Sequence, residues 1–191
     1  MGAMDLRRWL ATDLDSLRNR LVNGVLALIP PERMAERVDR GGIAPVYILW
    51  HAARHQDVAV NGVLRTADEV LHRWSSRVGL TGDSWRGLAE AEDLDLVPRL
   101  DPEAVGEYYL AVLDETARWV GEADLGVLDS TPDPAAALDR IGTPPDRFDW
   151  LYSMWDAKPG VFFLGWEAIG HGYNHLGELI SIRNRMGLSP F

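Results

Sequence analysis

The chain has 191 residues, no cysteine and a formal net charge of −10, so it can form no disulfide, thiolate metal site or thiol nucleophile. The acidic balance argues against a nucleic-acid partner, whose binding depends on neutralising phosphates, and no basic run points to an anionic lipid surface. Because the N-terminus lacks the apolar core of a signal peptide and no apolar run could span a bilayer, the sequence predicts a cytoplasmic protein.

Two long helices are predicted in the first third of what we expect to be a single domain, residues 1–191. In residues 5–29, apolar side chains recur at three- and four-residue steps until Pro30 and Pro31 end the pattern. Residues 44–64 form a second, largely apolar helix that carries a histidine near its middle.

The centre of the chain is less regular. A short helix is expected around Val70 and Trp74, in an excursion beside the bundle rather than in a second domain. Asp101, Pro102 and an acidic residue then mark the start of a third long helix, which runs to about residue 121. The proline-rich residues 122–146 predict a long connection, followed by a short helical piece over residues 147–155.

The last long helix is expected from about residue 161 and ends with Arg183 and Arg185 in its final turn, followed by Gly187. No stretch alternates as a strand does. The sequence therefore predicts an all-α protein, a four-helix bundle with long crossover connections. Most of its tryptophans are expected in the core, and a few in the wall of a pocket.

Histidines on two of these helices predict a metal site. His171 and His175 are four residues apart, so their imidazoles share one helix face, as in the H-x-x-x-H core of zincins. A zincin needs a glutamate directly after the first histidine, and Gly172 in that position excludes a protease of this class. His51 is the best third ligand, because an imidazole inside an apolar helix needs a partner. The alternative is three core histidines that are hydrogen-bonded and bind no metal.

Two segments together resemble the DinB-like superfamily of metal-binding helical bundles, which is related to the N-terminal domains of mycothiol-dependent maleylpyruvate isomerases and to thiol S-transferases. They are Leu49-Trp-His51-Ala-Ala-Arg-His-Gln-Asp57 and Gly170-His171, His175-Leu-Gly-Glu178-Leu, Ile182-Arg183 and Gly187-Leu188. The resemblance implies an up-up-down-down bundle with metal ligands at His51, His171 and His175. Such a three-ligand site would leave a coordination position for water or substrate.

Three further residues are weighed around this site. His55 lies one turn beyond His51 and could be a fourth ligand, a supporting group or an exposed residue. Glu178 could orient a ligand or a bound water, or simply pair with an arginine on its own helix. His72 has no recognisable partner in the sequence.

The resemblance implies a metal-dependent enzyme that joins a low-molecular-weight thiol to a small electrophile. Imidazole and oxygen ligands suit zinc, nickel, iron or manganese, and zinc or nickel is the ion we expect. The chain has eighteen arginines and one lysine, a codon-usage bias typical of bacteria with GC-rich genomes, and this favours mycothiol as the thiol. A metal-dependent hydrolase is the first alternative. The second is a non-enzymatic, stress-related metal-binding or interaction bundle, which could form a homodimer.

Overall fold

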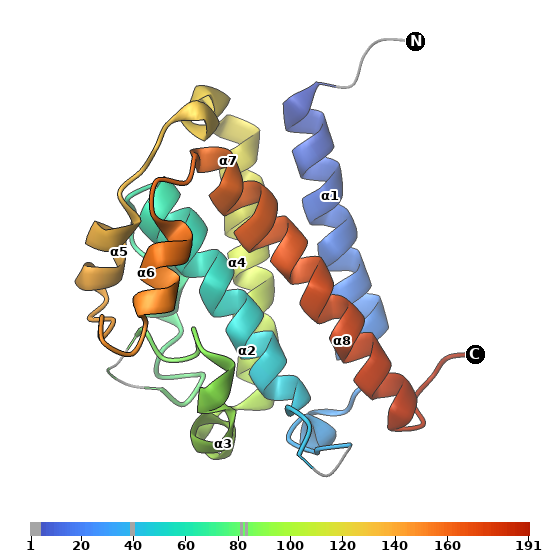
Figure 1. Ribbon diagram of the computed structural model, residues 1–191. Helices are drawn as coiled ribbons and strands as arrows, with labels where there is room; N and C mark the ends of the chain where they lie inside the picture. Colours follow the sequence, from blue (N-terminus) through green and yellow to red (C-terminus); the bar gives the residue numbers. More distant parts are fainter. Residues whose placement is uncertain (1–4, 39–40, 81, 83) are drawn as a thin grey trace.

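The computed structural model describes residues 5–38, 41–80, 82 and 84–191, and within these ranges the chain forms helices and turns but no strand (Figure 1). The all-α prediction is confirmed. Four long helical stretches correspond to the predicted ones, and three of them include π-helical segments. They are α1 (Leu6–Leu21) continued by η1 (Val22–Leu26), α2 (Pro45–Gln56) continued by η3 (Asp57–Leu64), α4 (Pro102–Glu122), and α7 (Gly160–Phe162) continued by η8 (Phe163–Gly170) and α8 (His171–Arg185). No helix in the described part is long and apolar enough to cross a membrane.

The starts of these helices follow from side-chain capping. The Asp5 carboxylate accepts a hydrogen bond from the Arg8 amide, and the Asp101 carboxylate accepts one from the Ala104 amide. Pro45 and Pro102 occupy first-turn positions, where the missing amide proton costs nothing. The predicted helix starts were therefore correct to within a few residues.

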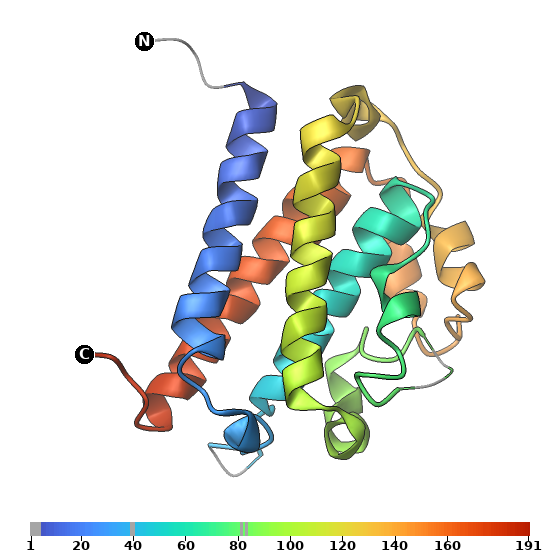
Figure 2. The same ribbon diagram turned by 180° about the vertical axis from the view of Figure 1, so that it is seen from behind.

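The four long stretches pack in a ring in which α2 and α1 each contact α4 and α8 (Figures 1 and 2). Their directions differ from the expected up-up-down-down order, because α1 and α8 run one way and α2 and α4 run the other. The connection between η1 and α2 starts and finishes at the same end of the bundle, and so does the connection between α4 and α7. In the described part of the chain, the connection between η3 and α4 is the one that crosses from one end of the bundle to the other.

The three connections between the long helices contain short helices. The crossing connection holds η4 (Val70–Arg73), η5 (Glu90–Glu92), α3 (Asp93–Leu96) and η6 (Val97–Arg99), and η2 (Pro31–Arg33) lies between the first two long helices. The later connection holds η7 (Leu125–Asp129), α5 (Pro134–Arg140) and α6 (Asp149–Trp155). The sequence predicted α6 but missed α5, although Asp133 caps it and Pro134 begins it in the same way as Asp101 and Pro102 begin α4.

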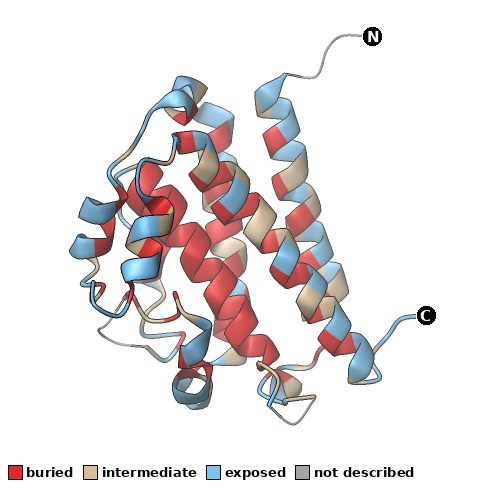
Figure 3. Cartoon of the chain, viewed as in Figure 1, coloured by how far each residue is buried: buried red, intermediate tan, exposed pale blue. Residues whose placement is uncertain are grey.

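The core is organised around α2 and η3, which are buried at every position (Figure 3). Most of their side chains are apolar, but they also place Arg54, Asp57 and two histidines in the interior. Buried polar groups of this kind must find partners inside the protein, because water cannot reach them. These partners determine where the crossing connection lies.

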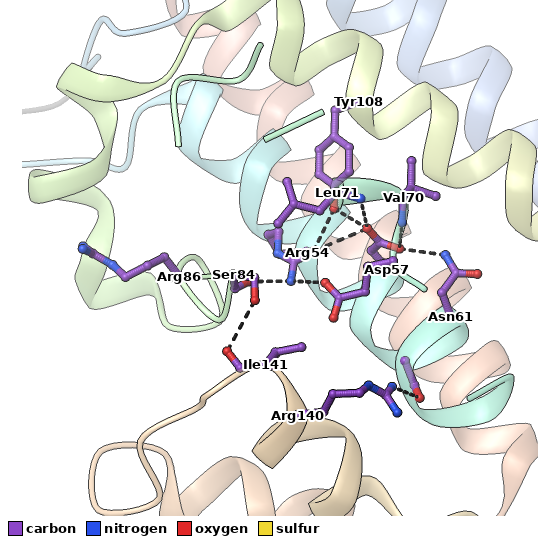
Figure 4. Close-up of polar contacts among 12 residues, drawn as sticks. Arg54, Asp57, Asn61, Val70, Leu71, Ser84, Arg86, Tyr108, Arg140 and Ile141 are labelled. Atoms are coloured by element: carbon purple, nitrogen blue, oxygen red, sulfur yellow. Dashed lines mark hydrogen bonds and ion pairs between the residues drawn. The ribbon is translucent and has the colours of Figure 1, made fainter. Parts of the chain in front are cut away.

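Arg54 is the centre of one buried network (Figure 4). Its guanidinium donates to Glu69 Oε2 at 2.6 Å and to the Tyr108 hydroxyl at 3.0 Å. Tyr108 in turn donates to Asp57 Oδ2 at 2.7 Å, and Asp57 accepts the amides of Val70 and Leu71 at 3.0 and 2.9 Å. The network ties the start of the crossing connection to α2 and α4.

Candidate metal centre

One face of α2 holds the backbone of residues 84–92, which we call the site loop. Side chains at successive turns of the helix donate to five of its carbonyl oxygens, so the loop runs along this face. The pairs are Tyr47 Oη with Ala89 O (2.5 Å), Trp50 Nε1 with Arg86 O (3.2 Å), His51 Nδ1 with Gly87 O (2.7 Å), Arg54 Nη2 with Ser84 O (2.6 Å) and His55 Nε2 with Leu88 O (3.0 Å). The site loop therefore has a fixed place beside the histidines.

We expect Gly87→Ala to destabilise the protein by about 2–3 kcal/mol. Gly87 has a φ of +101°, and a Cβ there would lie 2.1 Å from Trp50 Nε1. Gly142→Ala is the matched control, because Gly142 has a φ of +75° but its Cβ would meet nothing closer than 4.0 Å. The control should cost only the backbone strain, about 1 kcal/mol. Equal losses in urea unfolding of the two variants would contradict close packing of the site loop on α2.

Four imidazoles meet between α2 and α8. The ring centroid of His51 lies 4.5 Å from that of His55, 5.2 Å from that of His171 and 4.9 Å from that of His175. The rings of His171 and His175 are 4.4 Å apart. The expected meeting of His51 with the pair on the last helix is therefore present, and His55 joins the cluster as well.

Hydrogen bonds fix which ring nitrogens face the cluster. His51 donates its Nδ1 proton to Gly87 O, and His175 donates its Nδ1 proton to Glu178 Oε2 at 3.1 Å. Nε2 is then the unprotonated nitrogen of both rings, and in His175 it faces His171. His171 Nε2 lies 3.0 Å from His175 Nε2, and the buried His171 Nδ1 has no partner among the described residues.

The donor atoms fall into two groups that could each hold an ion. Ring nitrogens of His51, His55 and His171 lie within 4.8 Å of one another, and so do donor atoms of His51, Glu90 and His175. The expected set of ligands is thus distributed over both groups, with His175 in the second. His55 and Glu90 are the additional donors that geometry brings to the site.

His55 is buried, which excludes the exposed position and leaves the other two alternatives, a fourth ligand or a supporting group. Both of its ring nitrogens face oxygen atoms, Nδ1 at 3.0 Å from Glu167 Oε2 and Nε2 at 3.0 Å from Leu88 O. Glu167 is held on its other oxygen by Trp155 Nε1 at 2.8 Å. His55 could coordinate an ion only by giving up one of these contacts, which favours a supporting role.

The structure also shows the positions of Glu178 and His72 relative to the site. Glu178 touches the site, because it holds the Nδ1 side of His175 and so fixes the orientation of that ring. His72 is exposed on η4 and belongs to neither group of donors. Sequence reasoning missed Glu167, although a glutamate one turn before His171 in an apolar run was a usable signal.

Burial keeps the imidazoles of His51 and His171 neutral. Desolvation, followed by the neighbouring His55 and His175, lowers the pKa of His51 well below its usual value. Desolvation, followed by the other three histidines, also lowers the pKa of His171. Neutral imidazoles with free lone pairs are the form that binds a metal ion.

A cavity of about 450 Å³ opens beside the cluster. His51, His55 and His171 contribute to its inner wall, and Trp150, Met154 and Trp166 to its apolar side. The two tryptophans are 43% and 44% exposed, so they stand at the mouth. The expected pocket tryptophans are thus Trp150 and Trp166.

Comparison of the chain with models of protein families gives no match, and comparison with curated proteins gives none either. The function must therefore be inferred from the site itself.

Proposed function

We propose that the histidine cluster is the centre of a metal-dependent enzyme, with His51, His171 and His175 as ligands of one divalent ion. The observation that carries this proposal is the 3.0 Å contact between the Nε2 atoms of His171 and His175. Two nitrogens bound to one tetrahedral ion, each at about 2.1 Å, are about 3.4 Å apart, so this pair needs only a small adjustment to share an ion. The free Nε2 of His51 supports it as the third ligand.

The surroundings support these ligands. The Gly87 carbonyl and the Glu178 carboxylate hold the Nδ1 protons of His51 and His175, as outer partners of metal-bound histidines commonly do. We assign His55 to these outer hydrogen-bonding groups, because it lies between Glu167 and the Leu88 carbonyl. The His51, His55 and His171 group remains the alternative set of ligands.

Within this proposal the protein is a DinB-like S-transferase that uses a small thiol of the mycothiol type. A divalent ion, zinc or nickel, would lower the pKa of a bound thiol and so favour its nucleophilic thiolate. The apolar wall formed by Trp150, Met154 and Trp166 suits a small electrophile with a hydrophobic body. The histidines at the inner wall would hold the reacting end, and the tryptophans the remainder.

Two alternatives to the S-transferase remain. A hydrolase would use the same ion to activate water instead of a thiol. A non-enzymatic metal-binding or interaction bundle would need no cavity, so the opening beside the histidines favours an enzyme. Mycothiol itself, the cytoplasmic location and a homodimer stay predictions.

The test is the metal content of protein purified without a histidine tag, measured by elemental analysis for the wild type, His171→Ala and the control His72→Ala. We expect close to one ion per chain in the wild type and in the control. Loss of one nitrogen ligand should weaken binding in His171→Ala by about a hundredfold, roughly 2.7 kcal/mol. Folded wild-type protein that holds no ion, and gains no thermal stability from zinc or nickel, would overturn the proposal.

The metal-loaded protein then distinguishes the two reaction types. Incubation of an aromatic electrophile with a small thiol should consume both in equal amounts if the protein is a transferase. Turnover that does not depend on the thiol would favour the hydrolase.

A further inference from the structure

We infer that Glu90 is a further ligand of this metal centre, a carboxylate supplied by the site loop rather than by the helices that carry the histidines. This inference rests on the proposed metal centre and adds an oxygen donor to it. Its consequence is that the loop over residues 84–92 forms part of the coordination site as well as part of the cavity wall.

Proximity is the first support. A carboxylate oxygen of Glu90 lies within 4.8 Å of ring nitrogens of His51 and His175, and these two nitrogens lie within the same distance of each other. Donor atoms that share one ion are about 3–4 Å apart at normal bond lengths, so this group needs only a small contraction around an ion. Imidazole nitrogens together with a carboxylate oxygen are a common donor set for divalent transition metals.

The backbone on both sides of Glu90 is held in place. The Tyr47 hydroxyl donates to Ala89 O, immediately before it. The Glu92 carboxylate accepts the Gly87 amide at 2.8 Å and Arg86 Nε at 2.8 Å, which closes the turn after it. Glu90 therefore projects from a fixed piece of backbone rather than from a free loop.

The carboxylates of Glu90 and Glu92 differ in the hydrogen bonds that they accept. The Glu92 carboxylate is buried and fully used in holding the loop. Within the described part of the chain, no hydrogen bond or ion pair engages the carboxylate of Glu90, which lines the cavity beside His51. A carboxylate so placed is available to an ion, and its negative charge would offset part of the ion's charge.

The experiment compares the wild type with Glu90→Ala and Glu90→Gln, and uses Glu122→Ala as the matched control. Glu122 is an exposed glutamate at the end of α4 whose partner is Arg118 at 3.6 Å. The affinity for Zn²⁺ is measured by competition with a coloured chelator. The Co²⁺ derivative is examined in the visible region, where its absorption reports the number and kind of ligands.

We expect both Glu90 variants to bind Zn²⁺ at least about tenfold more weakly than the wild type and the control do. Their Co²⁺ spectra should also differ from that of the wild type. Weaker binding with an unchanged Co²⁺ spectrum would overturn the inference, because Glu90 would then act through its charge alone. Unchanged affinity and spectrum in variants of a metal-binding wild type would overturn it and leave the three histidines intact. A wild type that binds no metal would overturn the proposed function as well.

Discussion

Arg54→Met is expected to destabilise the protein by about 3–5 kcal/mol. The Arg54 side chain is fully buried and is the ion-pair partner of the buried Glu69 and Asp57 carboxylates. Methionine has a similar length but no charge, so the substitution leaves these two carboxylates without their cation. The loss of a buried partner costs far more than the loss of a surface pair, because water cannot take over its role.

Urea unfolding of Arg54→Met beside Arg118→Met measures this effect. Arg118 has two glutamate partners but is 56% exposed, so its removal should cost less than about 1 kcal/mol. Arg54 also donates to Ser84 O, at the start of the site loop. Faster amide hydrogen exchange in residues 84–92 of Arg54→Met is therefore expected. A loss as small as that of the control would show that the network contributes little to stability.

The helices were predictable because their cause is local. The periodic leucines of α1 and the Asp101–Pro102 start of α4 are features of consecutive residues, and the structure places both helices close to the predicted ranges. Helix directions are not local, because the same periodic pattern serves a helix that runs either way. The order of directions depends on which connections cross the bundle. In an up-up-down-down bundle the first and third connections would cross, whereas here the connection between η3 and α4 does, and composition does not reveal this difference.

The histidine cluster was partly predictable for the same reason. A four-residue spacing places His171 and His175 on one face whatever surrounds the helix, and His51 needed a partner because its helix is apolar. The spacing of His55 was equally visible, but its contacts with Glu167 and the Leu88 carbonyl depend on tertiary packing. Glu90 could not be predicted, since it reaches the site from a loop without any periodic pattern.

Contacts to backbone carbonyls could not be predicted from the sequence at all. Five side chains of α2 donate to carbonyls of the site loop, and every residue type presents the same carbonyl group. The useful signal lies in the donors, because Trp50, His51, Arg54 and His55 give an apolar helix a single polar face. That one face both orients His51 and holds the loop that carries Glu90. Substitutions in the loop backbone and in the histidines are therefore expected to affect each other.

The metal-free protein should lose stability as the pH falls below about 6.5. In the unfolded chain, His51 and His171 bind protons near this usual pKa, whereas burial and the neighbouring histidines lower the pKa of both rings in the folded protein. The unfolded state then binds more protons, so acid favours unfolding. Each ring should contribute a loss of up to about 2 kcal/mol at pH 5, and the loss is absent above the unfolded pKa.

His171→Gln isolates this contribution from the carboxylates that also titrate in acid. The free energy of unfolding, measured in urea at pH 7.5 and pH 5, should fall by about 2 kcal/mol less in His171→Gln than in the wild type. The exposed His72 provides the control, since His72→Asn should show the wild-type dependence. An identical fall in all three proteins would mean that the cluster accepts protons while folded.

Saturating zinc should raise the free energy of unfolding at pH 7.5 and lose this effect at pH 5, because protons compete with the ion for the same lone pairs.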